Sequence, residues 1–298
     1  MRNPGFGPGR LYAVIVEGPK DPHLLAEGSF LLTSFRQNVR GGVRMPQKPT
    51  EADVAVNGIS LHYELRREGP PVLLLHGGTG CHADWAYAGR EFFERDYRLI
   101  IPDARGHGRS TNDQPNITHR QCALDMLALL DHLKIERCKA IGVSMGGNIL
   151  LHMATMQPER IEAMVIVSAT PYFPEQARKV MAVVPAPDDQ PASEWETMRK
   201  RHHLGDDQIP ALWEWSRSLK DSYDDMNFGP ADLAKIRAHT LIVQGDRDFL
   251  YPVEMSVEMY RAIPSSALWI VPGGSHGPIF MDRAEQFAKT ALAFLCAS

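Results

Sequence analysis

The sequence AIGVSMGGN, at residues 140–148, decides the fold of this 298-residue chain. It contains a G-x-S-x-G pattern, with Ser144 between Gly142 and Gly146, where a short apolar run meets an amphipathic run that continues to Met156. A serine at a sharp turn from strand to helix needs neighbours without a Cβ, because the chain passes itself closely there. Such a turn lifts the serine Oγ clear of the sheet and points the next backbone N–H, that of Met145, toward the same space.

Apolar and amphipathic runs alternate along most of the chain. The apolar runs are typical of strands buried on both faces of a parallel sheet, and they cover residues 72–75, 97–101, 139–143, 164–168, 240–244 and 267–271. The amphipathic runs predict helices around residues 85–93, after Thr118, after Ser144, around 253–263 and over 282–295. Near the start, alternating residues flank Asn57-Gly58, a two-residue hairpin signal. We therefore predict a doubly wound α/β fold whose mostly parallel sheet begins with an antiparallel hairpin.

Two segments break this alternation. Residues 1–50 are rich in Gly and Pro and lack a sustained period, so we expect an irregular N-terminal extension; a dimerising arm, or translation that starts at Met45, is the alternative. Residues 171–231 hold three of the five tryptophans at helical spacing, which predicts a helical cap inserted into the fold. The α/β core then comprises residues 51–170 and 232–298.

Composition narrows the class of protein. With 44% hydrophobic and 23% charged residues, the chain can bury one large core plus an insertion. A net charge of -4 gives no basic surface for nucleic acid or an anionic membrane, so we expect neither as a partner. The four cysteines form no C-x-x-C pair, and no apolar run reaches the roughly 18 residues that span a bilayer. Free thiols and the absence of a secretory signal favour a cytoplasmic location.

Three residue types that work together in hydrolysis stand at strand ends. Ser144 follows one predicted strand, Asp248 a later one, and His276 the last. The carboxyl ends of parallel strands share one edge of a sheet, so these side chains should converge. A neutral imidazole can take the proton of a serine hydroxyl, and a carboxylate can fix the tautomer of that imidazole. Asp246 is the competing carboxylate.

Five motifs in this order resemble the α/β-hydrolase superfamily, and among its members the small capped esterases and lactonases. They are His76–Gly80, Asp103–Ser110, Gly142–Gly147, Gly245–Asp248 and Gly274–His276. The resemblance extends from about residue 51 to the C-terminus, apart from the expected cap. The G-x-x-D spacing of the family favours Asp248 over Asp246 as the acid.

This resemblance implies an activity and its residues. Ser144 would attack an ester or lactone, with no cofactor, while the N–H groups of Gly78 and Met145 hold the oxyanion; His76 would only organise its loop. A serine at this position argues against dehalogenases and epoxide hydrolases of the same fold, and Thr79 weakens a peptidase assignment. Hydrolysis of a carbon–carbon bond in a diketone, cofactor-free perhydrolysis and ligand sensing without turnover remain as alternatives.

The pair His202-His203 is the remaining candidate for a metal site. A zinc site takes three or four ligands, and no third ligand with suitable spacing accompanies the pair. We therefore predict no metal, and we expect both histidines on the solvated face of a helix.

Overall fold

The structure is a computed structural model that describes residues 14–17, 48–112, 114 and 117–297. Most of the expected N-terminal extension, including Met45, therefore lies outside the described residues. Within that segment, residues Val14–Glu17 form a short strand that pairs antiparallel with the last strand of the sheet. No helix in the described part of the chain is long and apolar enough to cross a membrane.

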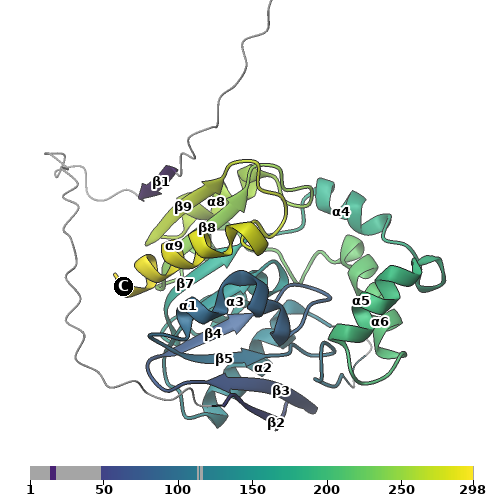
Figure 1. Ribbon diagram of the computed structural model, residues 1–298. Helices are drawn as coiled ribbons and strands as arrows, with labels where there is room; N and C mark the ends of the chain where they lie inside the picture. The colour runs from purple at the N-terminus through teal and green to yellow at the C-terminus, as the bar shows by residue number, and fades with distance from the viewer. Residues whose placement is uncertain (1–13, 18–47, 113, 115–116, 298) are drawn as a thin grey trace, which may run out of the picture.

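The described residues form one nine-stranded sheet in the order β1-β9-β8-β7-β6-β4-β5-β3-β2 (Figure 1). Neighbouring strands from β9 to β5 run parallel, and β1, β2 and β3 pair antiparallel with their neighbours. The strands are β1 Val14–Glu17, β2 Thr50–Val56, β3 Ile59–Arg66, β4 Pro71–Leu75, β5 Arg98–Pro102, β6 Cys138–Val143, β7 Ile161–Val167, β8 His239–Gly245 and β9 Ser266–Val271. The predicted fold class is confirmed.

The continuous apolar runs are explained by two hydrophobic clusters, one on each face of the sheet. In β4, Leu73 and Leu75 belong to one cluster, whereas Val72 and Leu74 belong to the other. Burying each of these side chains contributes roughly 2 kcal/mol, so a polar residue on either face would be costly. The two-sided burial therefore holds β4 and β6 at the centre of the molecule.

The predicted hairpin joins β2 and β3 through two residues. Asn57 has φ 44° and Gly58 has φ 84°, the pair of positive values that a type I′ turn needs. The turn sets the register, in which Val56 lies opposite Ile59. The hairpin prediction is thus confirmed.

Helices cover both faces of the sheet (Figure 1). The cluster on one face includes residues of α2 His119–His132, α3 Met145–Met156, α7 Pro230–Leu233 and α8 Val253–Ala262. The other face is covered by α1 Arg90–Phe93, α9 Ala284–Cys296 and the 3-10 helix His82–Ala88, and a 3-10 turn at Met281–Arg283 precedes α9. The single helix expected over residues 85–93 is wrong, because Gly89 at φ 77° ends one helix and starts the next.

Three further helices lie between β7 and β8, and we refer to them as the inserted helices. They are α4 Glu175–Ala182, α5 Ala192–Arg201 and α6 Gln208–Ser218, with 3-10 turns at Pro187–Asp189 and Leu219–Asp221. Figure 1 shows them grouped together at one side of the sheet. Helical spacing around residues 194–203 and 210–220 predicts α5 and α6, whereas no such spacing in the sequence predicts α4.

Candidate active site

Ser144 sits at the turn between β6 and α3 in strained backbone, with φ 51° and ψ -113°. The glycines on either side allow this conformation. A Cβ on Gly142 would lie 2.4 Å from the carbonyl oxygen of Gly146, and a Cβ on Gly146 would lie 2.3 Å from that of Leu75. Both contacts are too short for a carbon atom, so the G-x-S-x-G pattern is a steric requirement of this turn.

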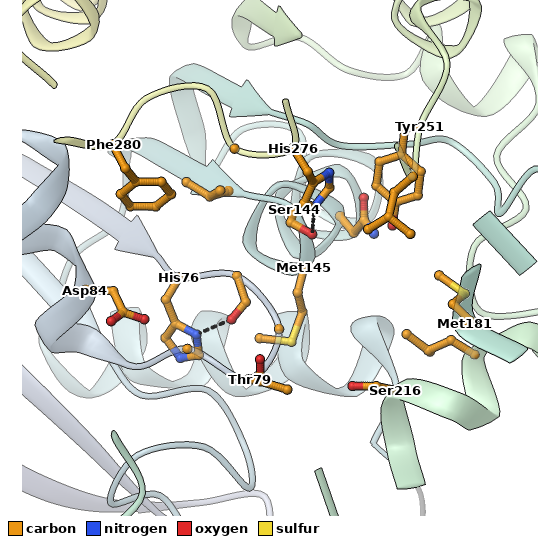
Figure 2. Close-up of a pocket in the computed structure, with 18 of the residues that line it drawn as sticks. His76, Thr79, Asp84, Ser144, Met145, Met181, Ser216, Tyr251, His276 and Phe280 are labelled. Atoms are coloured by element: carbon orange, nitrogen blue, oxygen red, sulfur yellow. Dashed lines mark hydrogen bonds between the residues drawn. The ribbon is translucent and has the colours of Figure 1, made fainter. Parts of the chain in front are cut away.

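The structure brings Ser144, His276 and Asp248 together in one hydrogen-bonded row. His276 Nε2 lies 2.8 Å from Ser144 Oγ, and Nδ1 lies 2.9 Å from Asp248 Oδ2. Figure 2 shows the contact between Ser144 and His276, with Tyr251 on one side and Phe280 on the other. The loops after β6, β8 and β9 supply the three residues, as their positions at strand ends led us to expect. Asp246, the competing carboxylate, is exposed to solvent.

Asp248 is held in its ionised form by its surroundings. Its Oδ1 accepts hydrogen bonds from the backbone N–H groups of Leu250 and Tyr251, and its Oδ2 accepts one from Gln244 Nε2 at 2.8 Å. Burial alone would raise the pKa of Asp248, but the hydrogen bonds from His276 and the backbone lower it below the usual range. A carboxylate in this state accepts from Nδ1–H and leaves the Nε2 lone pair facing Ser144.

The loop after β4 carries Gly78 beside Ser144. His76 fixes this loop, because its Nδ1 donates to the Gly77 carbonyl at 2.7 Å and its Nε2 accepts from the backbone N–H of Ala104. No hydrogen bond within the described residues uses the N–H of Gly78. Met145 is the first residue of α3, where backbone N–H groups lack a partner in the helix. Both predicted oxyanion residues line the same cavity as Ser144.

The cavity in front of Ser144 has a volume of about 550 Å³, within the range of small-molecule sites. Its lining is mostly apolar, and the inserted helices supply one wall, on which Met181 and Ser216 are visible in Figure 2. Residues of this wall that sequence reasoning did not single out are Val180, Val184, Ser216 and Leu219. Helical spacing alone gave no sign of which side of α4 or α6 would meet the cavity.

The expectation that His202 lies on a solvated helix face is wrong. Instead of a solvated position, its side chain is buried, with 3% of the residue exposed. Nδ1 accepts a hydrogen bond from the N–H of Gly108, and Nε2 donates to the carbonyl of Thr79 at 3.1 Å. Burial lowers the pKa of His202 to about 4, so the ring is neutral near pH 7. His202 thus joins the end of α5 to the loop that carries Gly78.

One group of potential metal ligands occurs among the described residues, formed by His62, His82 and Asp103. Both oxygens of the Asp103 carboxylate already accept hydrogen bonds. Oδ1 accepts from the backbone N–H and the ring Nδ1 of His82, and Oδ2 accepts from the N–H of Arg109. This carboxylate organises its loop, and we assign no metal to it.

Comparisons with known proteins agree with this geometry. A model of the alpha/beta hydrolase family matches residues 72–290. The chain belongs to the alpha/beta hydrolase family. Human serine hydrolase BPHL is 29% identical over 257 residues, which are 83% of this chain and 86% of that protein.

Solved alpha/beta hydrolases share the fold. Carboxylesterase CesB from Bacillus subtilis aligns with a TM-score of 0.68 at 22% identity, over 85% of this chain and 93% of that chain. A meta-cleavage product hydrolase from Pseudomonas fluorescens aligns with a TM-score of 0.67 at 19% identity, over 83% and 97% of the two chains. Membership in the family supports hydrolase activity. Members of this fold cleave different bonds, so the type of bond depends on the site.

Proposed function

We propose that this alpha/beta hydrolase cleaves a carboxylic ester or lactone through an acyl-enzyme intermediate, with Ser144 as nucleophile, His276 as base and Asp248 as the residue that orients the base. The observation that carries the proposal is the hydrogen-bonded row of these three side chains at the mouth of an apolar cavity. Serine is a weak nucleophile near neutral pH, and this row supplies the base that it needs.

In the first half of the reaction, Ser144 Oγ bonds to the substrate carbonyl carbon as His276 Nε2 takes the hydroxyl proton. The N–H groups of Gly78 and Met145 donate to the resulting oxyanion, and each such donor contributes about 3 kcal/mol in the transition state. The carbon–oxygen bond to the alcohol then breaks, and His276 gives its proton to the leaving oxygen.

In the second half, water attacks the acyl group on Ser144. His276 takes a proton from the water as its oxygen bonds to the carbonyl carbon, and the same two N–H groups hold the oxyanion again. When the bond to Ser144 breaks, His276 returns the proton to Oγ and the carboxylic acid is released. Neither half requires a metal or an organic cofactor.

The composition of the cavity supports a small, largely apolar acyl or alcohol group. Arg201 is the cationic side chain of the lining, and it lies 3.2 Å from the carboxylate of Asp84, which also lines the cavity. Because this pair neutralises itself, the site offers no free charge for a strongly ionic substrate.

The test is hydrolysis of p-nitrophenyl esters of increasing chain length by the wild-type protein and by Ser144→Ala. We expect the variant to lose turnover on the order of a million-fold. Ser216→Ala is a matched control, because Ser216 lines the same cavity but donates its hydroxyl to the Leu212 carbonyl. Equal rates for the wild type and Ser144→Ala would refute the proposal. A protein that hydrolyses a diketone but no ester would be a carbon–carbon bond hydrolase. A protein that binds a ligand tightly but turns nothing over would be a sensor.

A further inference from the structure

A second histidine–aspartate pair lies beside the substrate cavity. His119, the first residue of α2, has its Nδ1 2.6 Å from Oδ2 of Asp225. Asp225 also accepts the backbone N–H of His119 at 2.7 Å and that of Arg120 at 3.1 Å. The carboxylate therefore caps the helix and orients the ring at the same time.

The His119 side chain forms part of the cavity lining. The side chain is 2% exposed, and His119 lines the same cavity as Ser144. Since Nδ1 is engaged by Asp225, Nε2 is the ring nitrogen left for a molecule in the cavity. No hydrogen bond among the described residues involves this atom, and the rings of Phe173 and Trp215 pack against the imidazole with centroid distances of 5.8 and 6.1 Å.

Trp215 places this pair near the reacting centre. A Cβ on Gly78 would lie 3.3 Å from the six-membered ring of Trp215, so the indole packs directly on the oxyanion loop. The indole nitrogen donates to the Ile117 carbonyl at 2.8 Å, which fixes the ring in place. One indole therefore packs against both Gly78 and His119, and all three residues line the cavity that holds Ser144.

We propose that His119, oriented by Asp225, is a binding residue that accepts a hydrogen bond from a hydroxyl group of the substrate. The proposal rests on the proposed ester hydrolysis and narrows its substrate class to hydroxylated esters. Its chemical basis is the tautomer that Asp225 selects: the proton on Nδ1 is donated to the carboxylate, and in that tautomer Nε2 is the ring atom that can accept a hydrogen bond. In a mostly apolar lining, such an acceptor favours a hydroxyl over a methyl group of the same size.

The experiment compares pairs of esters that differ by hydroxyl against methyl. On the acyl side, p-nitrophenyl 3-hydroxybutanoate is paired with p-nitrophenyl 3-methylbutanoate; on the alcohol side, 2-hydroxyethyl butanoate is paired with propyl butanoate. We expect the wild-type protein to prefer the hydroxylated member of at least one pair by about tenfold in kcat/KM. His119→Phe should remove this preference, so that the ratio of kcat/KM between the hydroxylated and the methyl member falls to about one.

His152→Gln is the matched control. His152 Nε2 lies 3.7 Å from Oδ1 of Asp225, but this histidine is not part of the cavity lining. This variant should keep the preference. His119→Gln, which retains a side-chain acceptor, should keep part of it and serves if His119→Phe does not fold.

Two outcomes would overturn the proposal while ester hydrolysis stands. The first is a wild-type protein that hydrolyses both members of each pair equally well. The second is a His119→Phe variant whose kcat/KM falls to the same extent for both members of each ester pair. That result would make His119 and Asp225 purely structural. If neither the wild type nor Ser144→Ala hydrolyses any ester, the proposed function fails, and the proposal that rests on it fails too.

Discussion

Two histidine–aspartate pairs face one cavity, and they differ in what the far nitrogen meets. In both, the ring Nδ1 lies against a carboxylate, at 2.9 Å for His276 and Asp248 and at 2.6 Å for His119 and Asp225. His276 Nε2 then meets Ser144 at 2.8 Å, whereas His119 lines the cavity and its Nε2 has no hydrogen-bond partner among the described residues. The same two side chains are thus proposed to form a base where a hydroxyl is in reach and a binding group where none is.

The two pairs are also built on different supports. His276 and Asp248 stand on loops after β9 and β8, so the sheet fixes their separation. His119 begins α2, and Asp225 comes from the segment between β7 and β8, 106 residues away. The first pair depends on the sheet, and the second depends on the contact between a helix and the inserted segment.

The largest effect that sharpens this comparison is expected at the carboxylate of the first pair. Asp248→Asn should lower kcat on an activated ester by about 10⁴-fold, because the amide no longer fixes the tautomer that His276 needs. Asp246→Asn, two residues away and exposed, should leave kcat within about twofold. Steady-state kinetics of both variants decide the matter, and a larger loss for Asp246→Asn would overturn the assignment of the acid.

The second pair should make the stability of the protein depend on pH in the acidic range. Although burial alone would raise the pKa of Asp225, the hydrogen bond from His119 lowers it to about 2 in the folded protein, against roughly 4 for an unfolded chain. The group therefore stabilises the fold above about pH 4 by about 2 kcal/mol, and this contribution is lost as the pH falls toward 2.

Urea unfolding of the wild type and Asp225→Asn at pH 6 and pH 3 measures that contribution. The difference in free energy of unfolding between the two proteins should shrink by about 1 kcal/mol at the lower pH. A difference that stays constant between the two pH values would show that Asp225 is not held ionised by its partners.

The smallest effect concerns the helix start that carries His119. Thr118 Oγ accepts a hydrogen bond from the N–H of Gln121 at 3.0 Å, so it caps α2 together with Asp225. Thr118→Ala should cost about 1 kcal/mol of stability, measured by thermal or urea unfolding. Thr118→Ser, which keeps the hydroxyl, should retain most of it; equal losses for the two variants would mean that the hydroxyl contributes nothing.

The sequence was informative where backbone geometry restricts the choice of residue. The turn at Ser144 tolerates no Cβ on either side, and the two-sided burial of β4 demands an unbroken apolar run, so both features can be recognised locally. Asp248 and His276 could be found as well, because parallel strands deliver their carboxyl ends to one edge.

Residues that act through long-range packing could not be found in this way. His119 looks like any residue in the first turn of a helix until Asp225 is placed against it, and His202 looks solvated until α5 docks on the loop of Thr79. Neither pairing has a short spacing that a motif could capture. The limits of the predicted cap, the oxyanion role of Gly78 and Met145, and the cytoplasmic location stay predictions.

The hydrogen bond from His202 to the Thr79 carbonyl has a consequence for engineering and for evolution. With it, and with Trp215 resting on Gly78, the inserted segment shapes the loop expected to hold the oxyanion. A chimera that receives residues 171–231 from a relative would exchange part of that loop's support along with the pocket wall. Grafts that retain His202 and Trp215 should therefore tolerate new wall residues far better than grafts that replace the segment whole.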